Sequence, residues 1–464
     1  MASAAPRYDA WLSAEAVAAL SEKAGDPSST ARERREAHSR FLKLPLEPNP
    51  LYRGYGYFSN VDLAGLDPAA SGPAVALPPQ NEGTVRVVHD ASGTRGFVPP
   101  ELVSAGVRFR AFEEIWSGGE ADIVAFLGKE EEATDRLSAL GSALVNRGYE
   151  LELPDRYRAP VRVADYAVLS LPHEAISIHR SVRCGVGSQL LFTEEVFSTP
   201  EVPEGQRLHA SSTSLTTGAD AKVVYLGVHS PDMRTVSIYR RRATTGANSR
   251  IAWLWNGMGG FRTKVRNQST LAGAGSEVTD LQTFFGAGDQ SFDSSVDLTH
   301  TSTDTHGQSI TRGVFRDQAR GMSRGLVRIE HEARKTVAYV SEHAMLLSKG
   351  SRSDTIPILE ILCRDVKATH STSVAPVDPE KVFYLESRGF SQPAAVRLIA
   401  EGFLAYVHER APVAGLRELL YPLLAARWDG REVPWTGPEF PALPPLEVTG
   451  TEGAPEWRFD AKLR

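Results

Sequence analysis

The chain has 464 residues, 41% of them hydrophobic and 23% charged, which is the composition of an ordinary soluble globular protein. Its formal net charge of −6 gives no electrostatic basis for nucleic-acid binding, which needs a concentrated basic face. The longest apolar runs are broken by charges and proline, and the first residues lack the layout of a secretory signal. We therefore expect a cytoplasmic protein that contacts neither nucleic acid nor membrane.

Two cysteines, Cys184 and Cys363, lie far apart, and neither belongs to a C-x-x-C pair. This spacing excludes a disulfide framework and a zinc-ribbon site. The chain also lacks a G-x-x-x-x-G-K-[ST] loop, so we do not expect it to hydrolyse a nucleotide by P-loop chemistry.

Residues 1–155 are expected to form a mixed, largely helical N-terminal region. Apolar residues recur at helical spacing between Trp11 and Lys23, and good helix formers fill residues 31–41. Residues 84–89 alternate like a strand, and a further helical pattern runs from Glu130 to Arg147.

Residues 156–375 have the pattern of many short strands. Alternating runs at 221–228, 235–239 and 251–255 are typical of this region, and Gly, Ser, Asn and Asp separate them as turns require. Such a series fits a sandwich, a propeller or a solenoid. No strict hexapeptide repeat is present, so periodicity alone leaves these architectures open.

Helical patterns return in residues 376–430. Asp378 is placed to cap a helix that begins at Pro379, and Gly389 can end it in a left-handed conformation. A second helix with an apolar stripe follows, and we expect the two to form a hairpin that caps the end of the strand region. Residues 431–464 are rich in Pro and Gly and are expected to be extended or disordered.

Three motifs follow one another near the end of the strand region: Asp354–Ile361 (DTIPILEI), Val366–Val374 (VKATHSTSV) and Val382–Phe390 (VFYLESRGF). Their order, ahead of an amphipathic helix, resembles the SufB/SufD family of iron–sulfur cluster assembly proteins, and SufD more than SufB. The resemblance implies a mainly β fold, with a right-handed parallel β-helix as its core and α-helical regions at both ends.

The same resemblance indicates a cluster-assembly interface at Glu342, Cys363 and His370. Glu342 stands where SufB-like proteins carry the cysteine thought to receive sulfur, and a carboxylate cannot carry a persulfide. His370 stands where SufD-like proteins carry an interface histidine, and a neutral imidazole is a good ligand for iron. Because a cluster usually takes about four thiolates, this chain alone cannot supply them. We expect no intrinsic cofactor, only a transient cluster at the interface with a partner.

The resemblance also implies partners. A SufB-type paralogue is expected to pair with the chain, and a SufC-type ABC ATPase to dock on the C-terminal helices, where Tyr384, Arg388 and Phe390 stay free. SufC would bind the ATP, and a cysteine desulfurase or sulfur carrier would be an indirect partner of this chain. The chain itself is then a non-catalytic subunit.

Three alternatives remain open. One is a homodimeric SufB/SufD-type scaffold, and another is a purely structural solenoid that binds proteins. The third is a β-helix carbohydrate-active enzyme, which would need paired carboxylates in an exposed groove.

Overall fold

The computed structural model describes residues 12–45, 65–76, 83–127, 135–157, 159–199, 205–413 and 416–431. Its helices are α1 (Ala14–Ala24), α2 (Ser28–Lys43), α3 (Pro100–Ser104), α4 (Phe112–Ser117), α5 (Glu120–Leu127), α6 (Arg136–Leu144), α7 (Pro379–Glu386), α8 (Gln392–His408) and α9 (Leu416–Trp428). The first strands are β1 (Thr84–Asp90), β2 (Gly93–Phe97), β3 (Arg108–Ala111), β4 (Arg147–Leu153), β5 (Pro160–Leu169), β6 (Ala175–Cys184), β7 (Gln189–Ser198), β8 (Arg207–Thr217) and β9 (Lys222–Ser230). The remaining strands are β10 (Thr235–Thr244), β11 (Arg250–Gly257), β12 (Arg262–Leu271), β13 (Glu277–Gly286), β14 (Ser291–His300), β15 (His306–Phe315), β16 (Arg320–Ile329), β17 (Thr336–Leu346), β18 (Arg352–Ile361) and β19 (Val366–Pro376).

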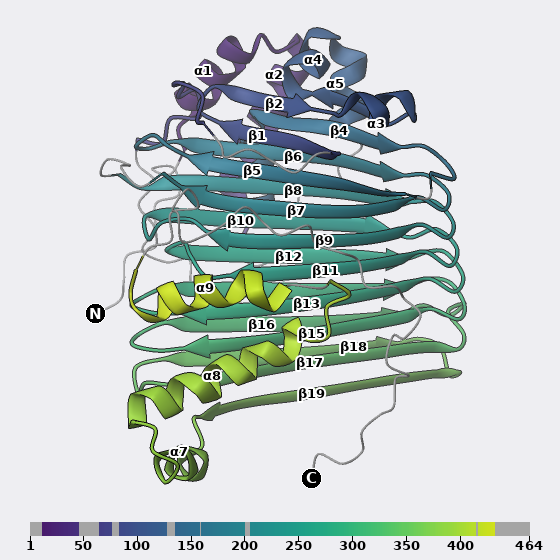
Figure 1. Ribbon diagram of the computed structural model, residues 1–464. Coiled ribbons are helices and arrows are strands. Elements are labelled where there is room, and N and C mark those ends of the chain that lie inside the picture. The colour runs from purple at the N-terminus through teal and green to yellow at the C-terminus, as the bar shows by residue number, and fades with distance from the viewer. Residues whose placement is uncertain are drawn as a thin grey trace.

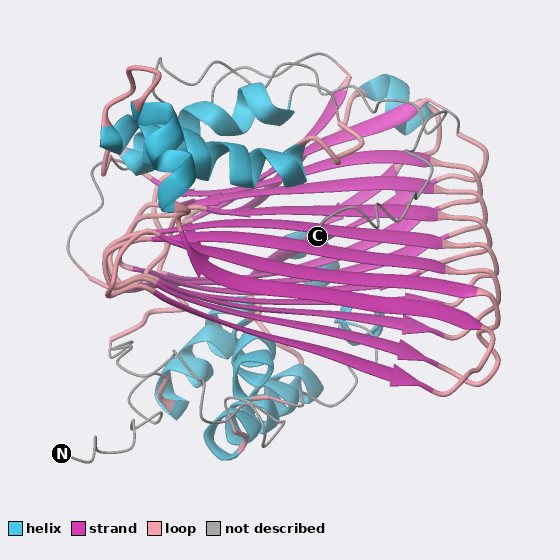
Figure 2. Cartoon of the chain, turned by 90° about the horizontal axis from the view of Figure 1, so that it is seen from below, coloured by secondary structure: helices cyan, strands magenta, loops and turns pink. Residues whose placement is uncertain are grey.

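The strands form a parallel β-solenoid of about eight turns, with two strands in each turn. From β4 onward, successive strands alternate between a ten-stranded sheet that holds the odd-numbered strands and a nine-stranded sheet that holds the even-numbered ones. Helices lie on both sides of the strand layers, as the view from below shows (Figure 2). The expectation of a mainly β, parallel solenoid with helices at both ends is confirmed. The predicted tail from residue 432 on lies outside the described residues.

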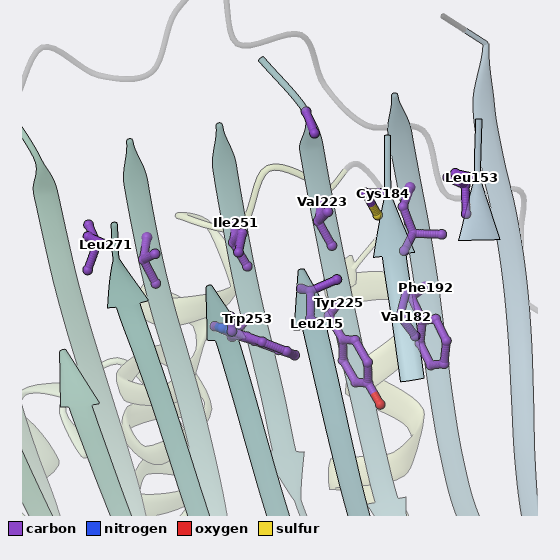
Figure 3. Close-up of a cluster of buried hydrophobic side chains, with 14 of the residues drawn as sticks. Leu153, Val182, Cys184, Phe192, Leu215, Val223, Tyr225, Ile251, Trp253 and Leu271 are labelled. Carbon is purple, nitrogen blue, oxygen red and sulfur yellow. The ribbon is translucent and has the colours of Figure 1, made fainter. Parts of the chain in front are cut away.

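The core lies between the two sheets, because alternate side chains of each strand point inward. Register pairs stack like positions on neighbouring turns, as Phe192, Tyr225 and Trp253 do on β7, β9 and β11. The rings of Phe192 and Tyr225 lie 4.4 Å apart, and those of Tyr225 and Trp253 lie 4.9 Å apart. Figure 3 shows this aromatic stack beside the aliphatic side chains of the same cluster.

A ladder of similar turns holds successive coils in register at one corner of the solenoid. Asp220, Asn248 and Gly275 occupy equivalent turn positions with φ of 58°, 53° and 70°. The backbone N–H of each donates to a carbonyl in the next turn: Asp220 to Ala247 (2.8 Å), Asn248 to Ala274 (2.9 Å) and Gly275 to Thr303 (3.1 Å). Left-handed conformations favour Gly, Asn and Asp, so the residues at these positions suit the turn.

The two ends of the solenoid are finished differently. At the N-terminal end, β2 pairs antiparallel with β1 and β3 with β4, while α1, α2 and α6 pack on the outer face of the even-numbered sheet. At the other end, no described strand follows β18 or β19 in either sheet.

The C-terminal helices do not close that end. Apolar residues of α8 and α9 pack on the outer face of the odd-numbered sheet, against Leu254 of β11, Leu281 of β13 and Ile310 of β15 (Figure 1). The expectation that the helical hairpin caps the solenoid is therefore wrong. An amphipathic stripe requires an apolar surface, and the outer face of the sheet supplies one.

Replacing Gly273 by Ala tests the turn ladder. A methyl group at Gly273 would overlap the backbone of Gly246 in the preceding turn. We expect the free energy of unfolding to fall by roughly 3 kcal/mol, measured by denaturant unfolding. Gly141→Ala in α6 is the control, because a Cβ there meets nothing within 4 Å, and this variant should gain up to about 1 kcal/mol. Equal stability of the two variants would contradict the assigned role of the ladder.

Candidate functional site

The last turn of the solenoid leaves its interior uncovered by the described residues. The inward side chains of β18 and β19 continue the rows of the core but lie at the end of the stack: Thr355, Pro357, Leu359, Ile361, Ala368, His370, Thr372 and Val374. Ile361 is 43% exposed and Val374 is 39% exposed. An edge strand with exposed apolar residues and unpaired backbone groups is a surface that another strand can pair with.

His370 and Glu342 lie on the same inward face of adjacent strands. His370 of β19 pairs in register with Val340 of β17, and Glu342 is two residues further along β17, opposite Thr372. His370 is exposed at the open end, whereas Glu342 is buried one strand inside it. The structure thus brings these two predicted site residues close together.

The Glu342 carboxyl group lies in an environment that favours its neutral form. The Ser323 hydroxyl donates a hydrogen bond of 2.7 Å to Oε1, and Oε2 has no hydrogen-bond partner among the described residues. Burial raises the pKa of Glu342 to about 7, although the Ser323 hydrogen bond and the charge of Arg324 act in the opposite direction. Glu342 is therefore partly protonated at neutral pH.

Cys363 does not join this pair. It follows β18 in the corner that leads to β19, and it is buried in the main core cluster with Ile329 and Val340. The predicted site residue Cys363 therefore packs as a core side chain. The structure describes no group of three or more His, Cys, Asp or Glu side chains in its residue ranges that could hold a metal ion.

The predicted partner-binding residues lie on and just beyond α7, beside the open end (Figure 1). The Asp378 carboxylate caps this helix by accepting a 2.9 Å hydrogen bond from the N–H of Glu380, as expected. Phe383 is 72% exposed, Tyr384 56% and Phe390 45%. The guanidinium of Arg388 lies 5.2 Å from the centre of the Tyr384 ring. Three aromatic side chains and one cation thus form an exposed surface, here called the α7 surface.

Residues 170–403 match the family model described as the SufBD core domain of the SUF system for FeS cluster assembly. This chain belongs to the SufB/SufD family. The iron-sulfur cluster assembly protein SufD of Bacillus subtilis is 30% identical over 290 residues, which are 62% of this chain and 66% of that protein. A SufBD family protein of Staphylococcus saprophyticus is 22% identical over 314 residues, 68% of this chain and 67% of the relative. A SufBD family protein of Mycobacterium tuberculosis is 25% identical over 221 residues, which are 48% of this chain and 26% of that relative.

The resemblance to the SufB/SufD family, and to SufD within it, is confirmed. The three motifs that carry it all lie within the matched segment, on β18, on β19 and on α7 with the turn that follows it. The family's most recognisable residues therefore surround the open end and the α7 surface. No helix in the described part of the chain is long and apolar enough to cross a membrane.

Helices α8 and α9 are tied to the odd-numbered sheet by arginines that sequence analysis missed. Arg312 of β15 donates a 2.8 Å hydrogen bond to the Phe403 carbonyl, and its guanidinium lies 3.7 Å from the centre of the Tyr406 ring. Arg316 donates a 2.7 Å hydrogen bond to the carbonyl of Trp428 in α9. An outward-facing arginine on a strand is common, and nothing in its sequence context signals a helix above it.

A buried ionic network in the first half of the solenoid was also missed. Arg180 joins Asp165 at 2.6 Å and Glu194 at 3.0 Å, and Arg241 joins Glu194 at 2.7 Å, with all four side chains within the core. Burial alone would raise the pKa of Asp165, but the charges of Arg180 and His89 lower it to about 2. Charged residues at inward positions of the strand alternation are the sequence signal for such a network.

Glu342→Gln tests the assigned state of this carboxyl group. The wild-type folded state holds a proton on Glu342 between about pH 4.5 and 7 that the unfolded state has lost, so the contribution of Glu342 to the free energy of unfolding falls with rising pH over that window and levels off above it. The loss is on the order of 3 kcal/mol. The variant cannot titrate at this position and should lack this contribution, while other buried groups, such as Asp280 with its pKa raised to about 6, titrate in both proteins. Denaturant unfolding from pH 4.5 to 8 measures the difference between the two profiles, and parallel profiles would contradict the assignment.

Proposed function

We propose that this protein is a SufD-type scaffold subunit of an iron–sulfur cluster assembly complex. Its open solenoid end pairs with a SufB-type chain, and a SufC-type ATPase binds the α7 surface. The observation that carries the proposal is His370 on the exposed inner face of the terminal turn, beside unpaired strand edges. Membership in the family supplies the cluster-assembly context.

Pairing at the open end has a direct physical basis. Most of the turns have a neighbour on both sides, but the described residues cover β18 and β19 on one side only. A partner with a similar open end would bury Ile361 and Val374 and satisfy the exposed backbone groups. Burial of apolar area contributes about 25 cal/mol per Å2, so covering the end stabilises both chains.

The cluster would form transiently between the paired ends as cargo of the complex. His370 would offer an imidazole nitrogen toward iron, while thiolates would come from the SufB-type partner, since Cys363 is packed in the core. Glu342 lies behind His370 and cannot carry a persulfide. The chain then contributes one ligand and one side of the space in which the cluster forms. A desulfurase or sulfur carrier would deliver sulfur to the SufB-type partner.

The α7 surface suits an ATPase that acts mechanically. Phe383, Tyr384 and Phe390 expose aromatic area of the kind that dominates protein interfaces. Helix α7 packs against α8, and α8 is fastened to β15 by Arg312. A displacement of α7 by the ATPase would therefore reach the last turns of the solenoid. In this proposal the chain hydrolyses no ATP itself.

His370→Ala tests the role of the interface histidine. The side chain is exposed, so the variant should keep the wild-type melting temperature within about 1 °C, because exposed substitutions change stability little. Cluster assembly, measured as the activity of an iron–sulfur enzyme in a strain that lacks the native protein, should fall at least tenfold. Ser371→Ala, on the outward side of the same strand, is the control and should complement fully. Full complementation by His370→Ala would remove this residue from the proposal.

Arg388→Glu tests the α7 surface separately. Reversing an exposed charge beside Tyr384 should leave the melting temperature unchanged and weaken SufC binding at least tenfold, measured by calorimetry on the folded variant. The control is Arg334→Glu, an exposed charge reversal at the opposite corner of the solenoid. Equal affinities of the two variants for SufC would place the ATPase elsewhere.

A further inference from the structure

Helix α8 crosses the outer face of the odd-numbered sheet near the open end, and basic side chains gather beside it (Figure 1). Arg312 of β15 and His343 of β17 are register neighbours on this face, and both are half-buried. Arg410 follows α8 in the chain and is exposed. The charge of Arg410 acts on Arg312, and the charge of Arg312 acts on His343, so the three groups form one cluster.

Both arginines of this cluster stack on one aromatic ring. The guanidinium carbon of Arg312 lies 3.7 Å from the centre of the Tyr406 ring, and that of Arg410 lies 3.4 Å from the same centre. Two guanidinium groups at these distances would overlap if they lay on the same face of the ring. They therefore lie on opposite faces, and the ring of Tyr406 holds two positive charges close together.

Each guanidinium group is also held by a backbone carbonyl. Nη1 of Arg312 donates to the Phe403 carbonyl at 2.8 Å, and Nη1 of Arg410 donates to the Tyr406 carbonyl at 3.0 Å. Neither arginine forms an ion pair with a carboxylate of the described residues. Burial lowers the pKa of Arg312 to about 10, and the charge of Arg410 acts in the same direction. Two cations are thus fixed near each other without a countercharge, and a bound anion would stabilise this arrangement.

We propose that Arg312 and Arg410 bind a doubly charged tetrahedral oxyanion of the phosphate class, with His343 beside it. One dianion neutralises both arginines, which a chloride ion or a single carboxylate does not. Guanidinium groups present paired N–H donors that match phosphate oxygens. Because both side chains are already held in place, little side-chain freedom is lost when the anion binds. Free inorganic phosphate and a small phosphate monoester both carry this group.

The stack favours a small ligand over a nucleotide. Guanidinium groups occupy both faces of the Tyr406 ring, so the ring offers no face on which a base could stack. Nδ1 of His343 lies 2.6 Å from Oγ of Ser373 on β19, which engages the imidazole ring as well. Ser373 and His370 point to opposite faces of β19. The anion site is therefore separate from the interior of the open end, and it does not depend on the proposed pairing with SufB or on the α7 surface.

Titration calorimetry of the full chain tests the site, with inorganic phosphate, glycerol 3-phosphate or acetate at pH 7.5 and constant ionic strength. At least one of the two phosphates should bind with a stoichiometry of one per chain, and acetate should bind at least about tenfold more weakly. Tighter binding of glycerol 3-phosphate would identify a monoester as the ligand, and tighter binding of inorganic phosphate would identify the free anion. Equal affinities for acetate and phosphate would overturn the proposal, and so would the absence of binding by both phosphates.

Arg410→Gln removes one of the two charges at an exposed position. The variant should keep the wild-type melting temperature in chloride and bind phosphate at least about tenfold more weakly. Arg312→Lys keeps its charge but loses the planar pair of donors, so it should also weaken binding. Arg334→Gln, at the opposite corner of the solenoid, changes the net charge as Arg410→Gln does and is the control with wild-type affinity. Wild-type affinity in Arg410→Gln, or an equal loss in Arg334→Gln, would overturn the proposal.

Discussion

Stacking of one turn on the next is the interaction on which this molecule depends. Each inward side chain is packed between its equivalents on the turns before and after it, and each backbone group pairs across the same boundary. Every turn of the solenoid therefore has a neighbouring turn on both sides, except the first and the last. Antiparallel strands and helices close the N-terminal end, whereas the core is exposed at the C-terminal end of the described solenoid. The exposed position of His370 follows from this asymmetry.

The interior of the solenoid changes character along its length. Near the N-terminal end the ionic network of Asp165, Arg180 and Glu194 is fully buried and mutually compensated. Aromatic stacks follow, and near the open end lie a small cavity and the buried carboxyl group of Glu342, whose pKa is raised by burial. A slip of one residue in β6 would turn Arg180 out of the network, so that the buried Asp165 would lose its arginine partner and Glu194 would keep only Arg241. The network therefore opposes wrong registers, and the looser packing occurs where the stack ends.

Part of this architecture was accessible from sequence. Period-two alternation identified the strands, but it is common to sandwiches, propellers and solenoids, and the family motifs were needed to choose among them. A local signal was present, since T-G-A-D-A at 217–221 and T-G-A-N-S at 245–249 mark equivalent turns. The cap at Asp378 follows local rules and was predicted. The position of α8 was not predicted, because an apolar stripe does not specify which apolar surface it will contact. The burial of Glu342 was not predicted either, because it depends on strands that are distant in sequence.

The two free edges of the open end are not equivalent, because β18 contains Pro357. Proline has no N–H, and within sheets it is tolerated where that missing donor faces away from the neighbouring strand. The N–H groups of Arg352 and Leu362 donate toward β16, so odd-numbered positions of β18 donate toward its free edge. Pro357 is one of these positions and interrupts any continuous ladder there. In β19 the only proline is Pro376, the last residue of the strand. Only the free edge of β19 can thus form a long run of backbone hydrogen bonds with another strand. This difference determines how an incoming chain is oriented at the open end. It also protects the free edge of β18 against unspecific strand addition.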